Sequence, residues 1–153
     1  MKTPNDPRHQ TRKLALSLIY SRESFLREKN SPKFKLEDTK KASIHNLNIT
    51  NYNKAFLDEI VKGVEQNNEK LKEIISKNSN DWEINQMYLI DLSILLMATW
   101  EIYYKDTPQK VVVDEAVELA KEFGDNESSK FINGILAGII QDFNNSKNNI
   151  SET

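Results

Sequence analysis

The sequence contains no cysteine and only two histidines among its 153 residues. Without cysteine the chain can form no disulfide framework, no thiol nucleophile and no cysteine-ligated zinc or iron–sulfur centre. A histidine-based metal site would need carboxylates for most of its ligands, because only His9 and His45 are present. We therefore expect a protein that works without a metal or a cofactor.

Long hydrophobic runs are also missing. No apolar stretch approaches the roughly 20 residues that a helix needs to cross a bilayer, and the first ten residues, MKTPNDPRHQ, lack the apolar core of a secretory signal. A length of 153 residues fits one domain, residues 1–153, with a core of its own. We expect a cytoplasmic protein without membrane contact.

The sequence motifs typical of enzymes are absent as well. The chain has no glycine-rich phosphate loop, no nucleophile elbow of the G-x-S-x-G type and no H-E-x-x-H zinc pair. Glu115 and Glu118 lie within one helical turn, but we interpret them as neighbours on the solvent face of an amphipathic helix. The sequence thus predicts a protein without enzymatic activity.

Apolar residues at helical spacing are abundant. They predict helices over residues 8–29, 51–75, 84–104 and 110–123, and a last helix that begins near Asn126. The polar stretch 30–50 is expected to be a loop with one short helical turn. Val111-Val112-Val113 is the only strand-like run, and one strand cannot form a sheet. The expected fold is all-α: a compact helical bundle of five to seven helices.

Glycines and polar stretches indicate where helices end. Gly63 marks either a close contact between helices or a helix end. Gly124 stands where a C′ glycine terminates a helix, and Asn126 is placed to cap the next one. Residues 1–7 and 144–153 are expected to fray.

Positive charge is concentrated at the N-terminus. The net charge of −2 argues against a protein that coats nucleic acid without selectivity. Residues 1–13, however, hold four basic residues and one acidic residue. Arg8 and Arg12 are four residues apart on one helix face that can meet phosphates. Charge alone leaves a solvated N-terminal segment open as the alternative.

A second group of candidate RNA-binding side chains lies in the segment NESSKFING. Ser128, Lys130, Phe131 and Asn133 combine hydrogen-bonding groups, a cation and an aromatic ring, which is the chemistry that recognises single-stranded RNA. The expected helix start there also favours phosphate. Phe131 fits the apolar stripe of the last helix equally well, so a role in the core stays open.

Taken in order, these motifs resemble those of the NusB family of bacterial transcription antitermination factors. P-x-x-V-x-V-D-E-A-V-E-L-A-K-E-F-G followed by S-x-K-F-I-N-G-I-L, within residues 108–136, resembles the C-terminal signature of that family. R-K-L-A-L-S-L-I-Y at residues 12–20 resembles its first helix, and D-L-S-I-L-L-M-A-T-W-E at residues 91–101 its central helix. The resemblance extends over residues 8–140.

The resemblance implies a fold of two helical subdomains and a role in transcription antitermination, without catalysis or a cofactor. NusB-like proteins pair with NusE, a ribosomal protein of the small subunit. The pair binds the boxA sequence of nascent ribosomal RNA and joins NusA and NusG on RNA polymerase. The alternative is a non-catalytic protein-interaction module or a homodimer with no RNA role of its own.

The resemblance also implies roles for individual residues. Tyr20 and Asp91 match positions at which family members meet NusE. The implied RNA-binding residues are Arg8, Arg12, Lys13, Lys121, Ser128, Lys130 and Phe131. The chain departs from the family where His9-Gln10-Thr11 replaces further arginines, and where Leu96 stands at a position that often carries arginine. We therefore expect weak RNA binding by the chain alone and a greater reliance on NusE.

Overall fold

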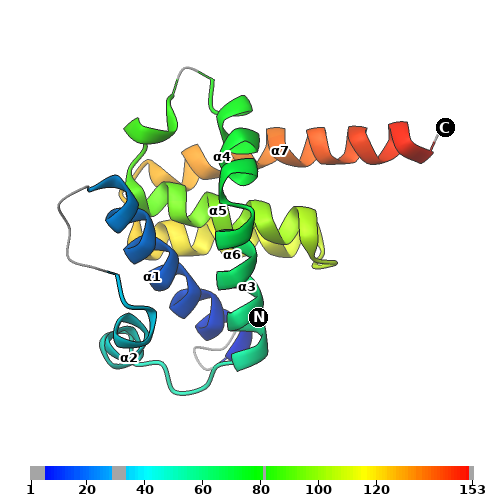
Figure 1. Ribbon diagram of the computed structural model, residues 1–153. Helices are drawn as coiled ribbons and strands as arrows, with labels where there is room; N and C mark the ends of the chain where they lie inside the picture. The colour runs from blue at the N-terminus through cyan, green and yellow to red at the C-terminus, as the bar shows by residue number, and fades with distance from the viewer. Residues whose placement is uncertain (1–5, 29–33, 81, 152–153) are drawn as a thin grey trace. The chain divides into compact units, whose positions relative to one another are not determined.

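The computed structural model describes residues 6–28, 34–80 and 82–151, and all regular elements in these ranges are helical. The elements are α1 (Pro7–Arg27), α2 (Leu36–Asn46), α3 (Lys54–Gln66), α4 (Asn68–Lys77), the 3₁₀ turn η1 (Ile84–Gln86), α5 (Leu89–Tyr104), α6 (Gln109–Phe123) and α7 (Ser128–Ser151) (Figure 1). The all-α prediction is confirmed.

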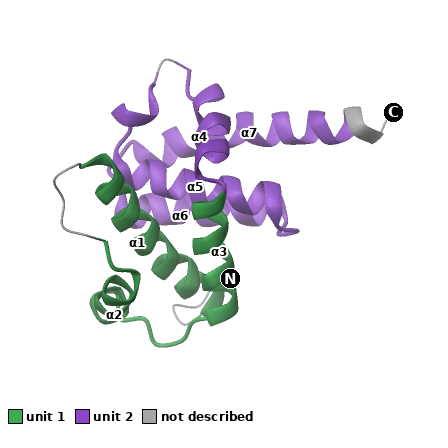
Figure 2. Cartoon of the chain, viewed as in Figure 1, with its two compact units in different colours: residues 1–66 green, residues 67–153 purple. Residues whose placement is uncertain are grey.

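The chain forms two compact units, residues 1–66 and residues 67–153 (Figure 2). In unit 1, α1 packs against both α2 and α3. In unit 2, α5 packs against α4, α6 and α7. The two helical subdomains expected from the resemblance are therefore present. That the whole chain behaves as one domain stays a prediction.

The start of α1 follows from its first residues. The Asp6 carboxylate accepts a hydrogen bond of 2.9 Å from the backbone N–H of Arg8 and caps the helix. Pro7 occupies the first turn, where a missing N–H costs little. The predicted apolar stripe forms the buried face of α1, which includes Leu14, Ala15, Leu18 and Ile19.

Residues 30–50 contain more structure than the sequence predicts. The expectation of a loop with one short turn is wrong, because α2 is an 11-residue helix. Ser43 is the only buried residue of α2, and its hydroxyl lies 2.6 Å from the hydroxyl of Ser17 on α1. A helix attached through polar contacts leaves no apolar period in the sequence, so periodicity could not reveal it.

The predicted helical segment 51–75 is interrupted in the structure. α3 ends at Gln66 and α4 begins at Asn68, so the apolar period continues across two helices that belong to different units. Gly63 lies buried inside α3 rather than at its end.

α5 occupies the centre of unit 2. Every residue from Asp91 to Ile102 is buried, as expected for a helix that is apolar on nearly all sides. The helix begins at Leu89 rather than at residue 84, because the separate turn η1 precedes it.

α7 is the longest helix, and its last turns extend past the other helices of unit 2 (Figure 1). Residues 144–148 are helical and exposed. Fraying of the two ends stays a prediction, and residues 1–5 and 152–153 lie outside the described residues. Among the described helices, none combines the length and the apolar character needed to span a membrane.

Candidate nucleic-acid interface

The three candidate cations on α1 differ in exposure. Arg8 is exposed and Lys13 partly exposed, whereas Arg12 is only 4% exposed. The guanidinium carbon of Arg12 lies 5.2 Å from the ring centre of Phe56 on α3, within the range of a cation–π attraction. Arg12 thus helps to hold α1 against α3. Its contact with RNA stays a prediction, and one that requires the side chain to leave Phe56.

Two of the three residues that replace further arginines in this arm have a structural role. Gln10 and Thr11 are both buried. The Gln10 side-chain oxygen accepts hydrogen bonds from the backbone N–H groups of Thr50 (2.8 Å) and Asn51 (3.2 Å). The Thr11 hydroxyl oxygen accepts another from the N–H of Asn53 (2.9 Å). These side chains attach the segment before α3 to α1. Uncharged residues in place of arginines thus stabilise unit 1 through buried hydrogen bonds.

The turn between α6 and α7 is built by reciprocal hydrogen bonds between Asp125 and Ser128. The Asp125 carboxylate accepts from the N–H of Glu127 (3.0 Å) and from the Ser128 hydroxyl (3.2 Å). The Ser128 oxygen accepts in return from the backbone N–H of Asp125 (3.1 Å), as in a capping box. The prediction that Asn126 caps this helix is wrong, because α7 begins two residues later, at Ser128, and the side-chain hydrogen bonds of the turn are made by Asp125 and Ser128.

Gly124 ends α6 as predicted, but for a different physical reason. Its φ is −93°, so the residue is not in the left-handed conformation of a C′ glycine. A Cβ atom at this position would lie 2.6 Å from the Cβ and Oγ atoms of Ser128 and 2.8 Å from the Ala120 carbonyl oxygen. Glycine is needed because the start of α7 passes so close to the end of α6.

Around this turn the candidate RNA-binding residues divide into surface and buried groups. Lys121 and Lys130 are exposed, Phe131 is partly exposed, and Ser128 is buried. Ser128 therefore shapes the turn, and its direct contact with RNA stays a prediction. A ligand can reach the two lysines, the ring of Phe131 and the exposed side chain of Asn133.

The structure adds one aromatic residue to this group. Trp82 is 53% exposed, and its ring meets that of Phe131 edge to face with 6.1 Å between the centroids. Trp82 is not among the residues that the sequence predicts to bind RNA. The signal that could have found it is a large aromatic residue within a polar stretch that precedes the central helix.

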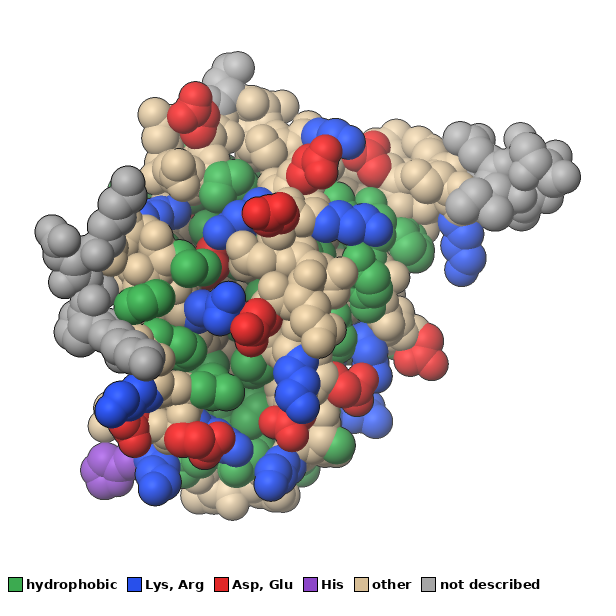
Figure 3. Space-filling model, viewed as in Figure 1, with side chains coloured by type: hydrophobic (Ala, Val, Ile, Leu, Met, Phe, Trp, Pro, Cys, Tyr) green, Lys and Arg blue, Asp and Glu red, His purple; other side chains and the backbone are tan. Residues whose placement is uncertain are grey.

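Charges of both signs are mixed on the face shown in Figure 3. Basic and acidic side chains alternate there and form no broad field of one sign. This distribution agrees with the net charge of −2. On this face a ligand with many phosphates would therefore bind to a few separate cations rather than to a continuous basic surface.

The two candidate partner-binding residues lie in different surroundings. Tyr20 on α1 is exposed, whereas Asp91 on α5 is 4% exposed and its Oδ1 atom has no hydrogen-bond partner within the described residues. Burial raises the pKa of Asp91, a hydrogen bond with Ser128 opposes the rise, and the charge of Asp125 adds to it. Contact of Asp91 with a basic partner stays a prediction, and the burial of the carboxylate does not favour it.

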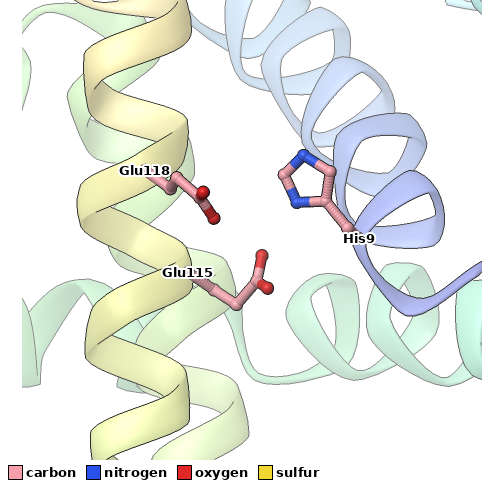
Figure 4. A group of neighbouring side chains, drawn as sticks. All are labelled: His9, Glu115 and Glu118. Carbon is pink, nitrogen blue, oxygen red and sulfur yellow. The ribbon is translucent and has the colours of Figure 1, made fainter. Parts of the chain in front are cut away.

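One expectation about α6 is corrected. The carboxylates of Glu115 and Glu118 project from the same side of the helix (Figure 4). Glu118 is exposed, but Glu115 is only 3% exposed. The prediction that both lie on the solvent face is therefore wrong for Glu115.

We expect Asp91→Asn to make the unbound protein more stable near neutral pH. A carboxyl whose pKa is raised by folding stabilises the folded state fully only below its ordinary pKa of 3.8, and this contribution is lost as the pH rises through the raised value. Thermal unfolding of both proteins from about pH 4 to about pH 8 measures the effect. The melting temperature of Asp91→Asn relative to that of the wild type should increase as the pH rises. The relative melting temperature of Asp114→Asn, at an exposed site, should not. Parallel pH profiles for wild type and Asp91→Asn would contradict this account.

Comparison with known proteins places the chain in a family. The family model for the NusB family matches residues 9–141. The transcription antitermination protein NusB of a Geobacter species is 35% identical over 131 residues, which cover 84% of this chain and 90% of the relative. The protein of the same name from Halothermothrix orenii is 37% identical over 137 residues, which cover 88% and 97%.

Solved structures agree with this assignment. The structure of T. maritima NusB is 28% identical with a TM-score of 0.69, and the match covers 92% of this chain and 93% of that one. A chain in the crystal structure of the antitermination factors NusB and NusE in complex with dsRNA has a TM-score of 0.69 at 22% identity, with 87% and 95% covered, and so shares the fold. From its sequence and its fold, the chain belongs to the NusB family.

Proposed function

We propose that this chain acts in transcription antitermination. It binds the boxA sequence of nascent ribosomal RNA together with NusE, and the pair joins NusA and NusG on RNA polymerase. The observation that carries the proposal is the family match over residues 9–141, supported by relatives named transcription antitermination proteins that align over nearly their whole length. A structure of the same fold holds NusB and NusE with dsRNA.

In this role the exposed cations bind phosphates and the exposed ring binds a base. Phosphate contacts supply affinity and orientation, while stacking and base-edge contacts supply selectivity. Arg12 and Ser128 support these contacts from buried positions. The proposed direct RNA contacts are Arg8 and Lys13 in unit 1 and Lys121, Lys130 and Phe131 in unit 2.

The role requires neither a catalytic step nor a cofactor, and it places the protein in the cytoplasm with the transcript. Each RNA contact is weak by itself. NusE supplies a second RNA-binding surface, and joining the two surfaces raises the effective concentration of each at the RNA. Tyr20, exposed on α1, is the candidate contact for NusE.

Transcription in vitro tests the proposal. The template carries a boxA sequence upstream of a terminator, and the reaction contains RNA polymerase, NusA, NusE and NusG. Adding this protein should raise read-through several-fold on the boxA template and leave it unchanged on a template with a scrambled boxA. Equal read-through on both templates would contradict the proposal.

The alternative role is an interaction module or a homodimer without its own RNA function. Such a protein would bind NusE or itself and would leave read-through unchanged. Sedimentation over a concentration series detects self-association. A dimer that dissociates when boxA RNA and NusE are added would reconcile self-association with the antitermination role.

A further inference from the structure

Trp82 is held in place and yet left half exposed. Its backbone N–H donates to the Ser79 carbonyl oxygen (3.1 Å), and the Ser79 hydroxyl donates to the Trp82 carbonyl oxygen (2.8 Å). The indole packs on Phe131 with an angle of 74° between the ring planes. A large aromatic ring ordinarily contributes to stability by burying its surface. Here 53% of the residue remains in solvent, on a backbone fixed by buried Ser79.

The exposed residues that neighbour these two rings in the chain are hydrogen-bonding and charged groups. Exposed Glu83 directly follows Trp82, Asn85 and Gln86 of η1 are exposed three and four residues after Trp82, and exposed Lys130 directly precedes Phe131. Side-chain amides pair with the edges of bases, and a lysine ammonium pairs with phosphate. A stable protein interface instead needs about 800 Å² per partner with an apolar centre. The surroundings of Trp82 therefore suit a nucleotide better than a protein surface.

We propose that Trp82 and Phe131 together form a stacking platform for one unpaired base of single-stranded RNA, and that the side-chain amides of Asn85 and Gln86 form hydrogen bonds with the edge of that base. The inference rests on the proposed function and adds to it a contact outside the C-terminal signature. A ring that is fixed before binding loses little freedom when a base stacks on it, so the platform adds affinity that does not depend on salt.

The chain carries its own probe for this contact. It has two tryptophans, and the second, Trp100 on α5, is 5% exposed in the core of unit 2. A change of tryptophan emission when boxA RNA is added to the complex with NusE therefore reports mainly on Trp82. We expect the emission to be quenched by boxA RNA and to change much less with a scrambled RNA.

Variants of the full-length protein, titrated with boxA RNA in the presence of NusE, test the platform directly. Trp82→Leu is expected to bind about ten- to one-hundred-fold more weakly, as is usual for the loss of one stacked base. The slope of log K against log salt should not change, because stacking releases no counterion.

Trp82→Phe should retain most of the affinity. Lys130→Ala should instead reduce the slope by about 0.7. Tyr104→Leu, an exposed ring at the other end of α5, serves as the matched control and should bind as the wild type does.

The possible results separate this inference from the function on which it rests. If wild type binds boxA RNA and Trp82→Leu binds it equally well, the platform is overturned and the proposed function stands. If Trp82→Leu loses affinity for NusE in the absence of RNA, the ring belongs to a protein interface and the platform is again overturned. If wild type shows no preference for boxA in any condition, both proposals fail.

Discussion

Replacing Gly124 with alanine is expected to lower the free energy of unfolding by about 2 kcal/mol, within the range usual for overpacking. The new Cβ would lie 2.6 Å from the Cβ and Oγ atoms of Ser128 and 2.8 Å from the Ala120 carbonyl oxygen. Neither Ser128 Cβ nor a backbone oxygen can move aside without shifting a helix. For a protein of this size the loss corresponds to a melting temperature lower by roughly 4–8 °C.

Gly134→Ala is the matched control for this effect. Gly134 lies inside α7, and a Cβ atom there would have no heavy atom within 4 Å. Alanine in an exposed helix interior is favoured over glycine by up to about 1 kcal/mol, so this variant should be slightly more stable than wild type. Urea and thermal unfolding of both variants give the comparison. A Gly124→Ala protein as stable as wild type would show that the two helices do not approach as closely as described.

Replacing Arg12 with alanine is expected to lower the free energy of unfolding by about 2 kcal/mol, the size usual for a desolvated cation–π contact. The substitution removes a desolvated cation–π contact with Phe56 and the packing of the aliphatic part of the side chain. Arg12→Lys should recover only part of this loss, because a lysine ammonium lacks the planar stacking surface of arginine. Urea unfolding of the three proteins measures the series.

Arg8→Ala is the control. It distinguishes a residue that stabilises the fold from one that contacts RNA directly. Arg8 is exposed on the same helix, so its loss should change the free energy of unfolding by less than about 0.5 kcal/mol. It should reduce the salt slope of boxA binding by about 0.7, whereas Arg12→Ala should leave that slope nearly unchanged. A reduced slope with Arg12→Ala and unchanged stability would mean that Arg12 reaches RNA directly, as the sequence first suggested.

Periodicity in the sequence predicts the parts of this fold that are held by apolar contacts. The stripe of α1 and the nearly uniform apolar surface of α5 were both recognisable, because burial of whole helix faces leaves a regular spacing. The polar helix α2 was missed for the same reason. Its only buried residue, Ser43, contacts Ser17 of α1, which lies far from it in the chain.

The candidate site was predictable by residue type but not by the role of each residue. Arg12, Asp91 and Glu115 are charged residues that the spacing rules place at the surface, yet all three are buried. What buries a charged side chain is a partner distant in sequence, such as Phe56 for Arg12 or Ser128 for Asp91. Trp82 is the opposite case, an apolar residue that stays exposed. Its contact with Phe131 of the last helix is visible only in the structure, because the two residues lie far apart in the sequence.

Partner-dependent RNA recognition is tested most directly by the binding of a short boxA RNA to the purified protein, with and without NusE. A scrambled RNA of the same composition and two salt concentrations complete the design. We expect selective binding of boxA with NusE present and much weaker binding by the protein alone, because each surface contributes only part of the affinity. Equal affinity for the boxA and scrambled RNAs, or equal affinity with and without NusE, would contradict it.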